Sequence, residues 1–266
     1  TVRLVAKNFD IPEDLVMVSS TGVIGAPLPM DRFKTGIPQL KEQISFDIVE
    51  NFAQAILTTD TCQKIVRETG CIDTPQGPKT FSIMGVAKGS GMIRPDMATM
   101  LAYVLTDADI TAADLKVALT AANERSFNRI TVDGDTSTND TLLCLASGSS
   151  DASIRDDAGL AVFQKLLEKV CFQLGKMIVK DGEGATKVIQ IIVRGAKTQE
   201  DAFKAAEAIA HSNLVKTAIY GQDPNWGRIT AAAGRSGAFV DPDKMDLYFE
   251  KMLLFLETLL LNFCYI

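Results

Sequence analysis

A threonine at the start of an apolar segment is the residue of this chain best placed for chemistry. Thr99 ends the glycine-rich stretch KGSGMIRPDMAT at residues 88–99 and precedes the apolar letters MLAYVL. The two glycines permit a close approach of the backbone, and Pro95 restrains the residue before it to an extended conformation. A hydroxyl held behind such a turn can attack the carbonyl carbon of the preceding residue, which is Ala98.

That attack is an N→O acyl shift, and hydrolysis of the resulting ester would leave Thr99 as a new N-terminal residue. Its free α-amine, with an ordinary pKa of about 7.7–8.0, could then act as the base for its own hydroxyl. This chemistry needs no histidine, and the chain has a single one, His211. By spacing alone, a turn into a strand with Thr99 as an ordinary β-forming residue is the commoner explanation.

The composition is that of a globular protein with no nucleic-acid or membrane partner. The chain has 266 residues, of which 47% are hydrophobic and 23% charged, and these fractions are typical of globular domains. A net charge of -6 argues against nucleic-acid binding and gives no attraction to anionic lipid. The apolar C-terminal run is interrupted by Glu257 and falls short of the ~20 residues that span a bilayer. The N-terminus lacks the pattern of a targeting segment, so we expect a cytoplasmic protein, or a mitochondrial or plastid one in a eukaryote.

Cysteine and histidine usage predicts neither a disulfide framework nor a metal site. The five cysteines form no C-x-x-C pair, which argues against zinc and fits a reducing compartment. Cys144 and Cys171 lie in apolar patterns that predict buried thiols. We expect His211 to be structural. The acidic stretch at residues 133–141 lacks the spacing of an EF-hand, and we interpret it as a hydrogen-bonded wall of the site.

Hydrophobic periodicity predicts a layered α/β (α+β) fold in one domain. Strands are expected at residues 14–20, 81–87, 100–105, 141–146, 187–194 and 216–220, and helices at 42–57, 112–124, 159–179 and 199–211. Small polar loops follow several of these elements, and sites are commonly built on such loops.

Six motifs then occur in one order along the chain. They are STGVIG at residues 20–25, AILTTDT at 55–61, KGSGMIRPDMATML at 88–101, TVDGDTSTNDT at 131–141, DGEGATK at 181–187 and GQDPNWGRI at 221–229. As a set they closely resemble the ornithine acetyltransferase family of arginine biosynthesis, whose members are also called glutamate N-acetyltransferases. The family shares its fold with N-terminal-nucleophile aminopeptidases, so the resemblance implies a layered αββα-type sandwich.

The resemblance also implies a precursor that cuts itself between Ala98 and Thr99. The products would be an α part, residues 1–98, and a β part that begins at Thr99. We expect a single domain over residues 1–250, followed by an apolar tail at 251–266 that does not resemble the family. The family's segment before residues 15–18, and its C-terminal substrate-contacting Asn and Thr, have no counterpart here.

Family roles carry over onto matching residues. Thr99 matches the nucleophile that carries the acetyl group. Thr21 and Gly22 match the oxyanion-hole pair, which uses a hydroxyl and a backbone N–H. Without the resemblance, these two residues would be interpreted as a strand-exit turn.

Thr58, Lys88 and Glu183 match substrate-binding positions. A lysine can pair with a substrate α-carboxylate, and Glu183 suits an ornithine ammonium. Structural alternatives are a helix-terminal Thr58, a solvated Lys88 and a turn carboxylate for Glu183. We also expect the segment at residues 225–227 to shape the core near the site, with Arg228 paired to a carboxylate.

The implied reaction is ping-pong and needs no metal or organic cofactor. N-acetylornithine acylates Thr99, ornithine leaves, and glutamate departs as N-acetylglutamate, while some relatives also use acetyl-CoA as donor. The resemblance implies an α2β2 heterotetramer of the cleaved chains. Two alternatives stay open: an N-terminal-nucleophile aminopeptidase or amidase that uses water as acceptor, and a truncated non-catalytic remnant.

Overall fold

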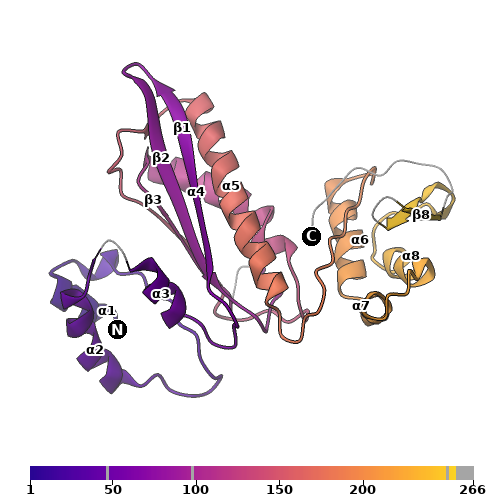
Figure 1. Cartoon of the computed structure of the whole chain (residues 1–266), viewed down its shortest axis with the longest axis horizontal. Helices are drawn as coiled ribbons and strands as arrows, with labels where there is room; N and C mark the ends of the chain where they lie inside the picture. The colour runs from indigo at the N-terminus through magenta and orange to yellow at the C-terminus, as the bar shows by residue number, and fades with distance from the viewer. Residues whose placement is uncertain (46–47, 97–98, 250–251, 256–266) are drawn as a thin grey trace.

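A four-stranded sheet forms the centre of the molecule (Figure 1). The computed structural model describes residues 1–45, 48–96, 99–249 and 252–255. The sheet has the order β1-β2-β3-β5, in which the pairs β1–β2 and β2–β3 are antiparallel and β3 runs parallel to β5. Its strands are β1 (Lys64–Thr74), β2 (Gly77–Lys88), β3 (Leu101–Thr106) and β5 (Thr141–Ala146).

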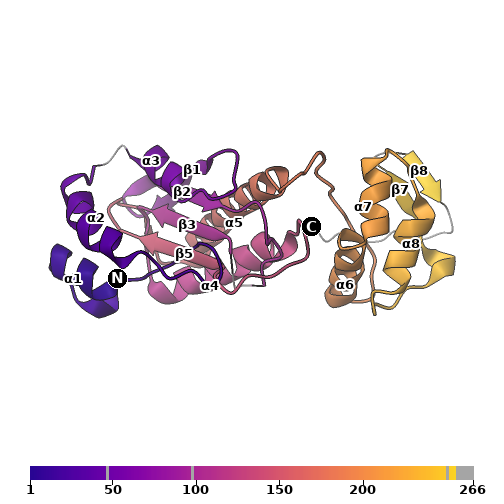
Figure 2. The same ribbon diagram turned by 90° about the horizontal axis from the view of Figure 1, so that it is seen from below.

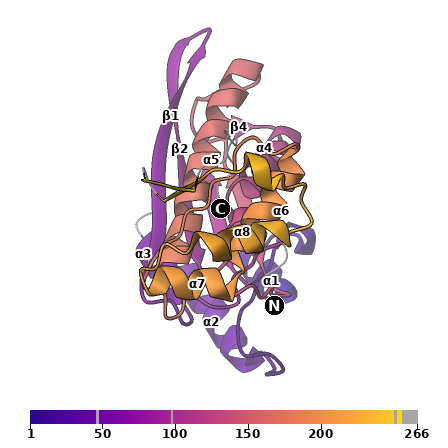
Figure 3. The same cartoon turned by 90° about the vertical axis from the view of Figure 1, so that its right-hand side faces the viewer.

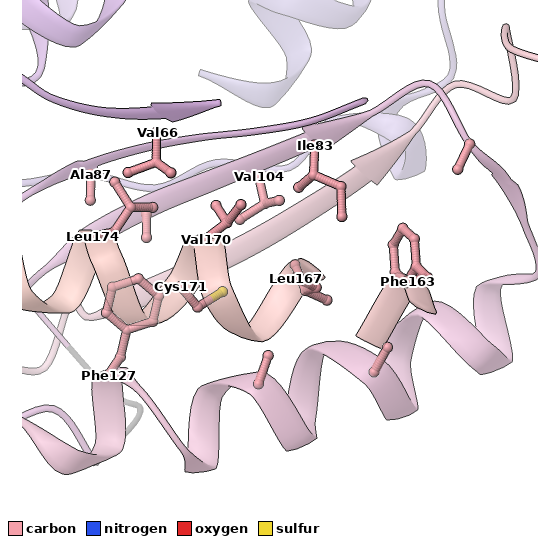
Figure 4. Packing of buried hydrophobic residues seen from close by; sticks show 14 of the residues in the cluster. Val66, Ile83, Ala87, Val104, Phe127, Phe163, Leu167, Val170, Cys171 and Leu174 are labelled. Atoms are coloured by element: carbon pink, nitrogen blue, oxygen red, sulfur yellow. The ribbon is translucent and has the colours of Figure 1, made fainter. Parts of the chain in front are cut away.

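Two helices cover one face of this sheet. They are α4 (Ala112–Glu124) and α5 (Asp157–Lys180), and each begins with a side-chain cap, Thr111 for α4 and Asp156 for α5. Apolar residues recur every three or four positions along α5 and form one stripe toward the core. Figure 4 shows Leu167, Val170 and Leu174 of this stripe facing the strands. Burying each such side chain contributes about 1.5–3 kcal/mol, so this layer holds the sheet in place.

Smaller groups of elements lie at both ends of the sheet (Figure 2). The N-terminal group has α1 (Val2–Phe9), η1 (Glu13–Leu15), α2 (Met30–Glu42) and α3 (Val49–Ala55). The C-terminal group has α6 (Gln199–Ala210), α7 (Asn213–Tyr220), α8 (Trp226–Gly234), η3 (Pro242–Lys244), β7 (Leu247–Phe249) and β8 (Met252–Phe255), and Figure 3 views the molecule from this end. Between these groups lie the short elements β4 (Asp109–Ile110), η2 (Phe127–Arg129) and β6 (Ser153–Ile154).

The expected mixed α/β class is confirmed. The predicted helices at residues 112–124, 159–179 and 199–211 are α4, α5 and α6, and the strands at 81–87, 100–105 and 141–146 are β2, β3 and β5. The described residues show one sheet layer with one helical layer against it, which is half of an αββα arrangement. Within that part of the chain no helix is long and apolar enough to cross a membrane.

Three predicted strands are wrong. Residues 14–20 contain η1 and exposed extended chain, with Leu15 66% exposed, because no neighbouring strand pairs with them in the described sheets. Residues 216–220 belong to α7, because the Ser212 hydroxyl accepts a hydrogen bond from the backbone N–H of Val215 and caps a helix there. Residues 187–194 form no strand.

The helix predicted at residues 42–57 is also wrong in its extent. Helix α2 ends at Glu42 and α3 begins at Val49. Phe46 and Asp47, which fall inside the predicted helix, lie outside the described residues. Strand β1 was not predicted, because its polar and charged sequence KIVRETGCIDT does not resemble a buried strand.

Candidate active site

The register of the sheet brings three of the motifs to one edge, those at residues 55–61, 88–101 and 131–141. Lys88 of β2 pairs with Leu101 of β3, which in turn pairs with Thr141 of β5. Since β2 ends where β3 and β5 begin, the loop leaving β2 and the segments entering β3 and β5 lie side by side. Lys64 begins β1 at the same edge, because it lies opposite Ala87.

Thr99 lies in the segment that enters β3, and the backbone after it is fixed by two hydrogen bonds. The N–H of Met100 donates to Asp140 Oδ1 at 2.6 Å, and the N–H of Thr141 donates to the Met100 carbonyl oxygen at 2.8 Å. Thr99 is half-buried and Met100 is fully buried. Ala98, the other half of the expected cleavage site, lies outside the described residues.

Asp140 is a titratable group of the site. No role of its own was predicted for it within the hydrogen-bonded stretch at residues 133–141. Burial raises the pKa of its carboxyl to about 7, while the Met100 N–H and the charge of Lys88 oppose that rise. Its Oδ2 atom is buried and has no hydrogen-bond partner among the described residues. The signal in the sequence was its position directly before β5, next to the strand that Thr99 enters.

Lys88 is buried rather than solvated, which rules out the surface-lysine alternative. Its side chain is 1% exposed, and Nζ donates to Thr21 Oγ1 at 2.8 Å. Burial lowers the pKa of Lys88, and the charges of Asp60 and Asp140 act in the opposite direction. Because the ammonium occupies a lone pair of the Thr21 oxygen, the hydroxyl proton of Thr21 can point to another acceptor.

The loop that carries Thr21 and Gly22 is tied to the same edge at a second point. Asn139 Nδ2 donates to the carbonyl oxygen of Ser20 at 3.1 Å. Asn139 directly precedes Asp140, so one short segment holds both the Thr21 loop and the backbone next to Thr99. Gly22 itself is exposed.

The acidic stretch at residues 133–141 forms hydrogen bonds to the glycine-rich loop, as interpreted from the sequence. The Asp133 carboxylate accepts from the backbone N–H of Met92 at 2.7 Å and of Ile93 at 3.0 Å. Met92 adopts a left-handed φ of 58°, which is uncommon for a residue with a side chain and is held here by that carboxylate. No group of three metal-ligating side chains occurs among the residues the structure describes.

Glu183 lies against the glycine-rich loop. A Cβ placed on Gly91 would come within 2.5 Å of Glu183 Oε1, so only glycine leaves room for this carboxylate. The N–H of Glu183 also donates to the Ser90 carbonyl oxygen at 3.0 Å. Glu183 is exposed and can therefore meet a ligand.

Thr58 is also exposed, and it reaches the site through a neighbour. Its N–H donates to Asp60 Oδ2 at 3.3 Å, and Asp60 Oδ1 accepts from the N–H of Gly89 at 2.6 Å. The structure thus joins the loops of Thr21, Thr58, Lys88 and Glu183 to the sheet edge that Thr99 enters.

The segment at residues 225–228 does not belong to this edge. Asn225 caps α8, which lies in the C-terminal group (Figure 2). Among the described residues Arg228 has no carboxylate partner, and its guanidinium donates to the Leu214 carbonyl oxygen and the Thr217 hydroxyl. Residues 225–227 therefore shape the C-terminal group rather than the site.

His211 is partly buried, and Cys171 is buried as predicted, whereas Cys144 is only partly buried, contrary to the prediction. His211 Nε2 lies 3.1 Å from Thr131 Oγ1, and burial lowers the pKa of the imidazole. Burial raises the pKa of the Cys144 and Cys171 thiols to about 12. A thiol with so high a pKa is a poor nucleophile.

Comparison with known proteins shows the family of this chain. A family model, the ArgJ family, matches residues 1–262. The chain therefore belongs to the ArgJ family. The match extends past residue 250, where the motif resemblance was expected to end.

Several relatives carry the same name, arginine biosynthesis bifunctional protein ArgJ. The chain is 49% identical over 252 residues to the one from Geobacter sulfurreducens, covering 94% of the chain and 63% of that relative. It is 50% identical over 247 residues to the one from Geobacillus stearothermophilus, covering 92% and 59%. The chain thus spans about three fifths of the length of these relatives.

A solved structure supports the fold. The crystal structure of arginine biosynthesis bifunctional protein ArgJ from Bacillus halodurans superposes with a TM-score of 0.55 at 45% sequence identity. The superposition covers 57% of this chain and 72% of that one.

Proposed function

We propose that this chain acts as an arginine-biosynthesis acetyltransferase, which moves an acetyl group from N-acetylornithine to glutamate. In this proposal the chain first cuts itself between Ala98 and Thr99, and Thr99 then carries the acetyl group. The observation that supports it best is the hydrogen bond from buried Lys88 to Thr21, at the sheet edge that Thr99 enters. In this proposal the bond leaves the Thr21 hydroxyl proton free to be donated to an oxyanion formed at Thr99.

The proposed acyl transfer needs no histidine as its general base. The freed α-amine of Thr99 takes the proton of its own hydroxyl, and Oγ1 attacks the acetyl carbon of N-acetylornithine. The Thr21 hydroxyl and the Gly22 N–H stabilise the tetrahedral oxyanion. The C–N bond then breaks, and the ornithine nitrogen leaves with the proton held by the α-amine. Glutamate reverses these steps with its own amine and departs as N-acetylglutamate.

The two charged residues of the site divide substrate recognition in this proposal. Glu183 is exposed beside Gly91, and its carboxylate suits the ammonium of ornithine. An ammonium has three N–H donors, so Lys88 can hold Thr21 and also a substrate α-carboxylate. Thr58 contributes a hydroxyl at the exposed rim.

The remaining parts of the proposal concern ligands and assembly. The reaction as written uses no metal or organic cofactor, and acetyl-CoA enters only as an alternative acetyl donor. The cleaved chains are proposed to assemble as an α2β2 heterotetramer.

Acceptor dependence tests this proposal. The purified chain is incubated with N-acetylornithine labelled in its acetyl group, with and without glutamate, and Thr99→Ala is the control. The proposal expects labelled N-acetylglutamate from the wild type alone. Label released as acetate at the same rate with or without glutamate would instead indicate an amidase. No labelling of Thr99 would indicate a non-catalytic remnant.

A further inference from the structure

A fully buried lysine, to which the family resemblance assigns no role, lies between three of the site loops. Lys64, the first residue of β1, has a side chain with no exposed surface. Its Nζ donates to Asp60 Oδ1 and to Asp181 Oδ2, both at 2.6 Å. The side chain of Asp60 is also fully buried, and that of Asp181 is 6% exposed.

Each of the two carboxylates holds a different loop. Asp60 Oδ1 accepts from the N–H of Gly89, in the loop that leaves β2, at 2.6 Å. Asp181 Oδ2 accepts from the N–H of Thr61 at 3.0 Å, and Oδ1 accepts from the Thr61 hydroxyl. The Asp181 carbonyl oxygen accepts from the Ser90 hydroxyl at 2.7 Å. These bonds connect the TTDT, KGSG and DGEG loops, and Lys64 joins the two carboxylates that make most of them.

The two carboxylates share one cation. Burial acts to raise the pKa of Asp60 and Asp181, but hydrogen bonds from Lys64 and from neighbouring donors outweigh it and lower both pKa values. The carboxylates are thus ionised at neutral pH, and each accepts a hydrogen bond from Lys64 Nζ. Buried ion pairs add little net stability compared with apolar packing. An apolar residue at position 64, however, would leave the two carboxylates without the cation that they share.

We propose that Lys64 is a positioning residue, which fixes the TTDT, KGSG and DGEG loops relative to one another and so sets the spacing between Lys88 and Glu183. The inference rests on the proposed function for the roles of Lys88 and Glu183. The Lys64 side chain is fully buried and cannot contact a substrate. Its replacement should therefore act indirectly, by displacing the loops that carry Lys88 and Glu183. The KM for N-acetylornithine rises, and kcat changes less.

Hydrogen exchange at two backbone amides tests the loop connection without relying on activity. Lys64→Met is expected to speed exchange at Gly89 and Thr61 about ten-fold or more, because charged hydrogen bonds hold both amides. Asp181→Asn, which keeps the shape of the side chain, is expected to affect Thr61 alone. The control is Arg67→Met on the same strand, whose ion pair with Glu50 is exposed.

The outcomes separate the two proposals. Faster exchange confined to these amides, with β3 and β5 unchanged and KM raised more than kcat, supports Lys64 as a positioning residue. Unchanged exchange in both variants overturns it, as does a uniform increase that includes β3 and β5. If Lys64→Met does not fold, the Thr61 amide in Asp181→Asn decides. A wild type without acetyl transfer overturns the proposed function, and the exchange result still decides the role of Lys64.

Discussion

Replacing Asp140 by asparagine should change the stability of the chain by an amount that depends on pH. The folded chain raises the pKa of this carboxyl from 3.8 to about 7. One pKa unit corresponds to about 1.4 kcal/mol, and because solvent screens this partly exposed group, ionised Asp140 should lower the free energy of unfolding by about 2–4 kcal/mol above pH 7. Between these pKa values the folded state keeps a proton that the unfolded chain has released, and stability therefore falls as pH rises.

Asparagine removes that dependence and keeps an oxygen for the Met100 N–H. Its amide nitrogen then lies where Oδ2 is buried without a partner, and an unsatisfied buried donor costs about 1–3 kcal/mol. At pH 4 the protonated carboxyl of the wild type also buries a donor, so Asp140→Asn should lose at most about 1–3 kcal/mol there. From pH 4 to pH 8 the difference should shift by about 2–4 kcal/mol in favour of the variant, because the wild-type carboxyl ionises and the amide does not.

Urea unfolding followed by circular dichroism at pH 4, 6 and 8 measures this effect. Asp151→Asn is the control, because its side chain is 83% exposed, and we expect its difference from the wild type to change little between pH 4 and pH 8. A difference for Asp140→Asn that keeps one sign and size from pH 4 to pH 8 would refute the burial argument.

Three further substitutions test the site and the core. Gly91→Ala should leave the urea midpoint nearly unchanged, because its Cβ meets the flexible end of Glu183, but should raise the KM for N-acetylornithine; an unchanged KM would contradict the placement of Glu183. Gly85→Ala places a Cβ 2.6 Å from Leu174 Cδ1 and should lower the free energy of unfolding by about 1–3 kcal/mol, which a neutral result in urea would disprove. Thr21→Val should lower the acetyl-transfer rate about 10²–10³-fold, and a rate close to wild type would exclude Thr21 from the oxyanion hole.

Elements with a strong local pattern could be predicted from the sequence. Helix α5 has a regular apolar stripe behind the cap at Asp156, and its predicted extent differs from the observed one by only a few residues. The strand predicted at residues 216–220 fails because an apolar run this short fits a helix or a strand. The capping serine at position 212 was the deciding signal.

The site could be predicted only in part. Thr99 and its neighbours stand out because small polar motifs repeat the order of a known family. Lys64 and Asp140 do not stand out, because a lysine at the start of a polar strand and an aspartate in an acidic loop resemble solvated residues. Their burial depends on partners far away in the sequence. Lys64, for example, binds Asp181, which is 117 positions away. Tertiary packing determines whether such a side chain is buried, and the local spacing of residues does not predict it.

Intact mass of the purified chain tests self-cleavage before Thr99. The wild type should give two fragments, residues 1–98 and 99–266, and Thr99→Ala should give one uncut chain. N-acetylornithine should then add one acetyl group to the fragment that begins with Thr99. A single full-length mass for both proteins would contradict self-cleavage and the role of Thr99 as nucleophile.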